Sequence, residues 1–84
     1  MEGGDLAKVF GAVVRAERER RGFSQEGFAD HVGVHRTYMG LVERGKSVVS
    51  IFTAYRIAQG LGVPLSTLLL KAEERFPVEQ DSSG

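Results

Sequence analysis

The sequence has no cysteine, only two prolines among 84 residues, and no net charge. Without cysteine the chain can form neither a disulfide framework nor a thiolate metal site, and a reducing compartment suits it best. The N-terminal residues lack the basic and apolar regions of a secretory signal, and no apolar run is long enough to cross a bilayer. We therefore expect a cytoplasmic protein with one domain, because a chain of this length supplies a single core.

A net charge of zero, taken alone, argues against a nucleic-acid-binding protein. The charges are unevenly distributed, however: residues 15–56 hold eight basic and five acidic side chains, whereas residues 71–84 hold two basic and four acidic ones. The basic residues of this middle segment are Arg15, Arg18, Arg20, Arg21, Arg36, Arg44, Lys46 and Arg56. An acidic C-terminal segment thus masks a basic middle that can neutralise phosphate.

Apolar residues recur with the 3.6-residue period of amphipathic helices, and no alternation lasts long enough to make a strand. The pattern predicts an all-α fold of five short helices. They are expected over about residues 5–21, 25–32 and 35–44, then after Ser50 and around Pro64, with Ser24 and Ser50 as the N-caps of the second and fourth helices. Their predicted ends are glycines that favour the left-handed conformation: Gly22, Gly33, Gly45 and Gly62.

The same periodicity predicts which helix faces are apolar. The first helix carries one stripe, made of Leu6, Val9, Phe10, Val13 and Val14. The predicted buried face of the fourth helix consists of Ile51, Ala54, Tyr55, Ala58 and Leu61. Pro77 must end any continuation of the fifth helix. Residues 5–70 are therefore expected to form the domain, and residues 71–84 a C-terminal extension with a helix end and a frayed polar tail.

One segment carries a pattern that points to function. Counted from Gln25 as the first position, a small residue, Ala29, is fifth and Gly33 is ninth. A small residue is needed where two helices cross closely, and a glycine where the turn between them takes a positive φ. Apolar residues fill the other packing positions: Phe28, Val32, Val34, Met39 and Val42. This register predicts two helices at a fixed angle, the second placed to enter the major groove of DNA. The alternative is an ordinary helical hairpin.

Four runs of sequence extend this pattern. They are Arg21-Gly22-Phe23-Ser24-Gln25-Glu26, Val32-Gly33-Val34-His35-Arg36-Thr37-Tyr38, Val42-Glu43-Arg44-Gly45-Lys46 and Ile57-Ala58-Gln59-Gly60-Leu61-Gly62-Val63-Pro64-Leu65. Together they resemble the XRE family of lambda-repressor-type regulators, over about residues 6–69. The His35–Tyr38 segment and the short chain are similar to those of restriction-modification controller proteins. The resemblance implies a five-helix lambda-repressor-like domain whose second and third helices form a helix-turn-helix.

The resemblance also implies which residues meet DNA. Gln25 would contact a phosphate at the start of the second helix, where both of its amide N–H groups are available. The implied base-reading positions on the third helix are His35, Arg36, Thr37 and Leu41, with Tyr38 and Arg44 near the DNA backbone. Two glycines, Gly27 and Gly40, depart from good helix propensity, each by about 1 kcal/mol relative to alanine.

Three side chains can be weighed by their chemistry. Arg36, in the first turn of the third helix, can donate two hydrogen bonds to guanine O6 and N7, whereas Lys46, in the following loop, can meet only phosphate. Thr37 can contact a thymine methyl group or a phosphate, or simply face water. A carboxylate late in the third helix would repel phosphate, so Glu43 is expected to pair inside the fold with Arg15 or Arg18.

Other chemistry finds little support in the sequence. His31 and His35 are four residues apart, but Gly33 puts them on different helices, so we expect no metal site. We also find no nucleophile beside a histidine and a carboxylate and no phosphate-binding glycine loop, so we expect neither an enzyme nor a cofactor.

A surplus of leucine in the fifth helix predicts a homodimer. The interface is expected to contain Leu65, Leu68, Leu69 and Leu70, because one buried face needs fewer leucines than this helix carries; a slightly wide core is the alternative. We therefore expect a dimeric transcriptional regulator on a partly palindromic operator in double-stranded DNA. The alternatives are a DNA-binding antitoxin whose protein partner binds residues 71–84, and a protein-interaction module that has lost DNA binding.

Overall fold

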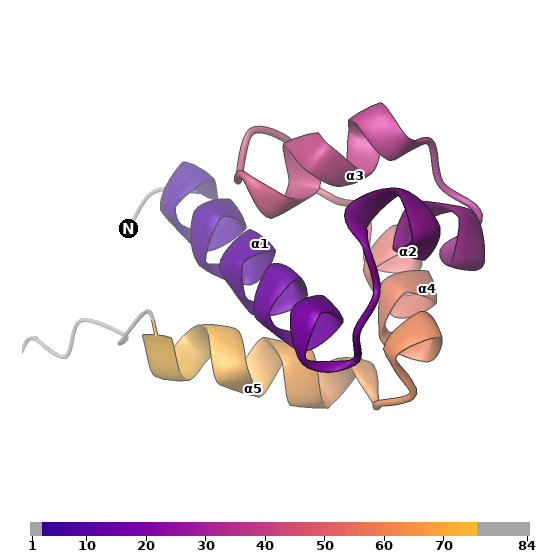
Figure 1. The fold of residues 1–84 in the computed structure, drawn as a ribbon. Helices are drawn as coiled ribbons and strands as arrows, with labels where there is room; N and C mark the ends of the chain where they lie inside the picture. The colour runs from indigo at the N-terminus through magenta and orange to yellow at the C-terminus, as the bar shows by residue number, and fades with distance from the viewer. Residues whose placement is uncertain (1–2, 76–84) are drawn as a thin grey trace, which may run out of the picture.

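The computed structural model describes residues 3–75, and over this range it consists of five α-helices without a strand (Figure 1). The helices are α1 (Gly3–Arg20), α2 (Gln25–Val32), α3 (Arg36–Glu43), α4 (Ile51–Leu61) and α5 (Leu65–Arg75). The predicted all-α fold and the order of its helices are confirmed. The expected helix end lies within residues 71–75, whereas Pro77 and the expected polar tail lie outside the described residues. No helix of residues 3–75 is long and apolar enough to span a membrane.

The two serines that the sequence offers as helix caps do cap helices. The Ser24 hydroxyl accepts a hydrogen bond from the N–H of Gly27 at 2.9 Å, at the start of α2. The Ser50 hydroxyl accepts one from the N–H of Thr53 at 3.0 Å, at the start of α4. Each bond satisfies a backbone donor that the first helical turn leaves without a partner.

Helix α1 lies between α3 and α5, and α2 packs on α3 and α4, so all five helices enclose one core (Figure 1). The core is made of the apolar stripes that face inward. It contains Phe10, Val13, Val14, Phe28, Ala29, Val32, Met39, Val42, Ala54, Ile57, Ala58, Leu61, Leu68 and Ala72. Since the core draws on both α2 and α3, their relative orientation is fixed by the same contacts that stabilise the domain.

Two glycines allow helices to approach each other closely. A Cβ at Gly11 of α1 would overlap the backbone carbonyl oxygens of Val42 and Glu43 in α3. A Cβ at Gly60 of α4 would overlap the Val32 side chain of α2. Both positions therefore require the smallest residue, and neither was singled out by the sequence pattern.

The predicted face of α4 is partly wrong. Ile51 and Tyr55 are 76% and 49% exposed, and the buried face instead includes Ile57 together with Ala54, Ala58 and Leu61. The helix is apolar on more than one side, so its sequence period allows several overlapping stripes. Packing against α1, α2 and α5 buries the stripe that contains Ile57, and Ile51 and Tyr55 remain on the surface.

Candidate nucleic-acid interface

Helices α2 and α3 form the predicted helix-turn-helix. Gly33 ends α2 with a φ of 79°, and the N–H of Val34 bonds the carbonyl of Ala29 at 3.0 Å. Phe28 and Met39, one on each helix, have no exposed surface, and the small Ala29 is equally buried. The predicted roles of the small residue and of the glycine turn are confirmed.

Helix α3 is the helix predicted to enter the major groove, and we call it the recognition helix. It begins one residue later than predicted. His35 precedes the helix as its N-cap, and its Nδ1 accepts a hydrogen bond from the N–H of Thr37 at 3.1 Å. This hydrogen bond holds the ring beside the first turn of the helix. His35, Arg36 and Thr37 are all exposed there, so the first turn of α3 presents three polar side chains to solvent.

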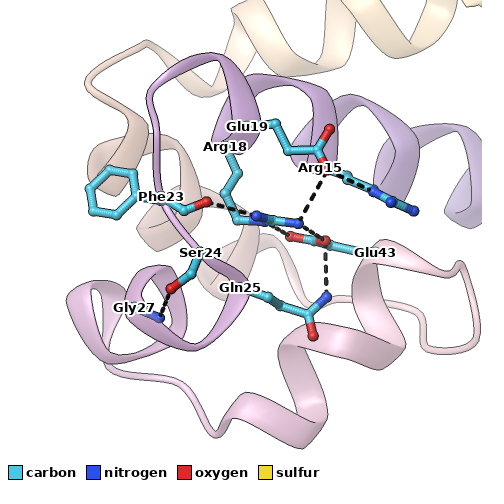
Figure 2. Close-up of polar contacts among 8 residues, drawn as sticks. All are labelled: Arg15, Arg18, Glu19, Phe23, Ser24, Gln25, Gly27 and Glu43. Atoms are coloured by element: carbon cyan, nitrogen blue, oxygen red, sulfur yellow. Dashed lines mark hydrogen bonds and ion pairs between the residues drawn. The ribbon is translucent and has the colours of Figure 1, made fainter.

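A buried ion pair joins α1 to the recognition helix (Figure 2). Arg18 donates from Nε to Glu43 Oε2 at 2.7 Å and from Nη2 to Glu43 Oε1 at 3.0 Å. Its Nη1 also donates to the carbonyl of Phe23 at 2.8 Å. The hydrogen bonds with Glu43 raise the pKa of Arg18 despite burial, which opposes its charge. Of the two arginines predicted as partners of Glu43, the structure therefore selects Arg18.

Gln25 extends this network to the first turn of α2. Its Nε2 donates to Glu43 Oε1 at 3.1 Å (Figure 2), so one of the two amide N–H groups expected to serve phosphate is used inside the fold. The space for this arrangement comes from Gly40, where a Cβ would lie 3.3 Å from both Gln25 Oε1 and Arg44 Nη1. The glycine inside the recognition helix thus makes room for two polar side chains beside α3.

Arg36 spans the gap between α3 and α2. Its Nη1 lies 3.3 Å from Glu26 Oε2, and its Nη2 lies 4.0 Å from Asp30 Oδ2. All three side chains remain more than half exposed. Glu26 and Asp30 are one helical turn apart on α2, so the guanidinium lies beside a pair of carboxylates on the outer face of the helix-turn-helix.

A family model described as a helix-turn-helix domain matches residues 9–69. The chain belongs to this helix-turn-helix family. The match runs from the middle of α1 into α5, so it covers the two helices of the motif and most of the helices that support them.

Several known proteins are similar to this helix-turn-helix chain. It is 37% identical over 71 residues to the control protein C.MunI of a Mycoplasma species, a match covering 83% of this chain and 96% of C.MunI. It is 31% identical over 77 residues to the transcriptional regulator SutR of Escherichia coli K12, covering 92% of this chain. The chain spans only 43% of the length of SutR.

Solved structures agree with these sequence matches. The restriction-modification controller protein C.AhdI from Aeromonas hydrophila superimposes with a TM-score of 0.72 at 35% identity, over 74% of this chain and 94% of C.AhdI. The regulator ClgR from Corynebacterium glutamicum, at 24% identity and a TM-score of 0.82, shares the fold. The predicted resemblance is confirmed: this is a DNA-binding helix-turn-helix regulator similar to restriction-modification controller proteins.

The other predicted DNA contacts of this regulator lie on or just after the recognition helix. Arg44 and Lys46 are exposed, whereas Tyr38 and Leu41 are half-buried. Tyr38 packs against the core, so only part of its ring faces solvent. The structure thus places these four residues on α3 or just after its end, and their contacts with DNA stay predictions.

The basic middle of this regulator is largely occupied by contacts within the fold. Six of its eight cations touch carboxylates or backbone carbonyls: Arg15, Arg18, Arg20, Arg21, Arg36 and Arg56. Within residues 3–75 no ion pair involves Arg44 or Lys46. The cationic surface left for phosphate is therefore smaller than a count of basic residues predicts.

Arg56 is a positioning residue that the sequence pattern did not reveal. From α4, its Nη2 donates to the carbonyl of Val32 at 2.8 Å and to that of Gly33 at 3.4 Å. These carbonyls lie where α2 ends and the turn begins, so Arg56 supports the turn of the motif. Arg56 and Val32 are 24 residues apart in the sequence, so no local sequence pattern predicts this contact.

His31 packs against aromatic rings, separate from His35. Its ring is stacked on Phe23 with centroids 5.0 Å apart, while His35 caps α3. In the part of the chain that the structure describes, no three histidine, cysteine or acidic side chains gather as a metal site would require.

An apolar groove lies away from the motif, between the start of α1, the loop before α4, and α5. Its volume is about 390 Å³, and its lining includes Leu6, Val48, Ile51, Leu65 and Leu69. Two of these side chains are strongly exposed, Val48 at 79% and Ile51 at 76%. Leu68, predicted as part of a dimer interface, is instead completely buried in the core and cannot reach a partner.

Proposed function

We propose that the chain binds a partly palindromic operator as a homodimer and regulates transcription from it, with one α3 in the major groove at each half-site. The observation that carries this proposal is the exposed first turn of α3, held by the buried core of the helix-turn-helix. A rigid helix with polar side chains at its entry is the device by which this motif reads base edges. Similarity to C.MunI and C.AhdI, a control protein and a controller protein by name, supports the regulatory role.

Contacts with the DNA backbone in this proposal come from a few groups. Arg44 and Lys46 flank the end of α3 and supply charge, while Gln25 retains one amide N–H at the start of α2. A helix N-terminus favours a phosphate oxygen through its backbone N–H groups. With so few cations, we expect a modest salt dependence, since the slope follows the number of phosphates neutralised.

The apolar groove supports the dimer. Val48, Ile51, Leu65 and Leu69 form a contiguous apolar surface on a small protein, and a second copy would remove it from water. The groove adds the loop before α4 and the start of α4 to the leucines of α5 that the sequence suggested. The proposed interface therefore comprises Leu65, Leu69 and Leu70 together with these neighbours.

Selection of bound sequences from a random DNA pool tests the proposal as a whole. We expect an enriched site with two related halves, separated by about one helical turn of DNA. A protein-interaction module without DNA binding would enrich nothing and would show no salt-dependent affinity for DNA.

A contrast between Arg36 and Lys46 then tests the proposed roles. Arg36→Ala should weaken operator binding by about 1 to 3 kcal/mol and relax the preference at one base pair in each half-site. Lys46→Ala should weaken all sequences alike and lower the salt slope by about one per subunit. Both variants are measured on the operator and on each single-base substitution of a half-site. Equal weakening of every sequence by Arg36→Ala would show that Arg36 does not read a base.

A further inference from the structure

The geometry around Arg36 points to Glu26 as a specificity-determining positioning residue. We propose that Glu26, assisted by Asp30, holds the Arg36 guanidinium away from phosphates and in place to contact a base. This inference rests on the proposed function, because it concerns how the same recognition helix discriminates between operator and other DNA. It assigns a role in DNA recognition to two acidic side chains of α2.

The placement of the three side chains is unusual for a surface meant to meet DNA. Glu26 Oε2 lies 3.3 Å from Arg36 Nη1, and Asp30 Oδ2 lies 4.0 Å from Nη2. Two carboxylates against one guanidinium leave a local net charge of −1 at the entry of α3. This is repulsive to a phosphate, and the repulsion acts on every DNA sequence equally.

The ion pairs are too exposed to serve mainly as a source of stability. The Arg36 side chain is 53% exposed, and those of Glu26 and Asp30 are 68% and 71% exposed. Water and salt screen such pairs, which therefore contribute little to folding. By contrast, the Arg18–Glu43 pair between α1 and α3 has side chains only 8% and 2% exposed. The exposed pairs therefore affect the position of the Arg36 guanidinium more than they affect the stability of the fold.

The chemistry of guanidinium explains how a carboxylate favours a base over a phosphate. The group has five N–H donors in a rigid plane, and contacts from its terminal nitrogens to Glu26 and Asp30 leave other donors free. A carboxylate on one side fixes the plane and reduces the conformational entropy lost when the other side meets guanine. The same carboxylate neutralises the positive charge on Arg36 that would otherwise attract a phosphate. Base contact is thereby favoured and phosphate contact disfavoured.

The scarcity of other cations strengthens the argument. Since Arg44 and Lys46 are exposed and form no ion pair within residues 3–75, both are available for contacts with DNA phosphates next to α3. An Arg36 freed from Glu26 would become a third phosphate-binding cation on this face. Its release should therefore be visible as an increased salt dependence on DNA of any sequence.

The test compares Glu26→Gln with Glu74→Gln in the full chain. Each variant removes one carboxylate, but Glu74 lies exposed on α5, and α1 separates α5 from α3 (Figure 1). Affinities for the operator and for random-sequence duplex DNA are measured over a salt series, and thermal melts confirm folding. The same measurements are repeated with each glutamine substitution combined with Arg36→Ala.

We expect Glu26→Gln to bind random-sequence DNA more tightly at low salt, with a slope steeper by about one per subunit. The operator-to-random affinity ratio should fall by about fivefold or more, since a two-bond arginine–guanine contact carries discrimination of that size. Both effects should disappear in the Arg36→Ala background and be absent in Glu74→Gln.

Two results would overturn the inference. In one, Glu26→Gln changes the affinities and the slope no more than Glu74→Gln does. In the other, its effects persist without Arg36, which would mean that Glu26 only repels phosphate. A wild-type protein that binds no DNA would overturn the proposed function itself, and would be distinguished by the wild-type arm alone.

Discussion

Glu17 is a buried carboxylate that three cations surround. Arg21 Nη1 lies 2.6 Å from Oε1, while Arg20 Nη1 and Lys71 Nζ lie 3.2 and 3.7 Å from Oε2. The hydrogen bond from Arg21 is the largest influence and lowers the pKa of Glu17, although burial opposes it. Because Lys71 belongs to α5, this residue links the supporting helix α1 to the C-terminal helix.

The lowered pKa of Glu17 predicts an acid-sensitive contribution to stability. A carboxyl with a folded pKa below its unfolded value stabilises the fold above the unfolded value, about 4.3, and this contribution is lost as pH falls through the folded pKa. Glu17→Gln should therefore lower the free energy of unfolding by about 1 to 3 kcal/mol at pH 7. The loss should become smaller as the pH falls below the pKa of an ordinary glutamate. Urea unfolding of both proteins from pH 7 to pH 3 measures the difference.

The control for this pH experiment is Glu19→Gln. Glu19, whose side chain is 54% exposed, lies 3.2 Å from Arg15 Nε and 3.8 Å from Nη2 of the buried Arg18. Water screens both contacts at this carboxylate, so its loss should change stability by less than about 1 kcal/mol. A Glu17→Gln cost that stays constant from pH 7 to pH 3 would contradict the proposed ionic contribution.

At the scale of the helices, the crossing of α1 over α3 determines where the recognition helix lies. The crossing is close because Gly11 faces the backbone of α3, and a Cβ would lie 2.8 Å from the carbonyl oxygen of Glu43. The buried Arg18–Glu43 pair joins the same two helices about two turns further along α1. A close backbone contact and a charged pair thus act together on the position of α3.

Because of this crossing, Gly11→Ala should destabilise the protein, although the same substitution stabilises an ordinary helix. Alanine in a helix interior normally stabilises by about 0.5 to 1 kcal/mol relative to glycine. At Gly11 the added methyl group must displace α3, so we expect a loss of about 1 to 3 kcal/mol and weaker operator binding. Thermal unfolding and operator titration measure the two effects. A stabilised variant with full operator affinity would show that α1 and α3 can move apart freely.

The helix ends were predictable because their causes are local. Ser24, Ser50 and Gly33 act within four residues of their partners, and all three behave as the sequence indicated. Gly11 depends on atoms more than thirty residues away, so no local pattern identifies it. The face of α4 was misassigned for a related reason, since Ile51 and Ile57 are equally apolar and only the neighbouring helices distinguish them.

The candidate site divides in the same way. The motif register located α3 and its exposed first turn, and charge alone suggested that Glu43 pairs inside the fold, as it does with Arg18. The partners of Arg36 on α2 and the support of the turn by Arg56 arise from side chains that cross between helices. Such contacts depend on helix orientation, which single-sequence periodicity does not encode.

At the scale of the whole molecule, the proposed DNA-binding surface and the proposed dimer interface lie on different helices. The first turn of α3 is available for DNA, and the apolar groove lies between α1, the loop before α4, and α5. A second copy on the groove would therefore leave α3 of each subunit uncovered. Two copies of α3 joined in this way could meet two half-sites on one DNA duplex.

The groove predicts that single charged substitutions separate the subunits without unfolding them. Ile51→Asp places a carboxylate at a side chain that is 76% exposed and lies in the first turn of α4, where a negative charge suits the helix dipole. Leu69→Asp does the same from α5, at a side chain 42% exposed. Each should convert the dimer to a monomer at micromolar concentration, as measured by sedimentation. Operator affinity should fall by about 10²- to 10⁴-fold, because two linked half-sites bind far more tightly than one.

Gln59→Asp, an exposed change elsewhere on α4, should leave both the dimer and the operator affinity intact. A wild-type chain that sediments as a monomer at this concentration and still binds the operator tightly would refute the dimer.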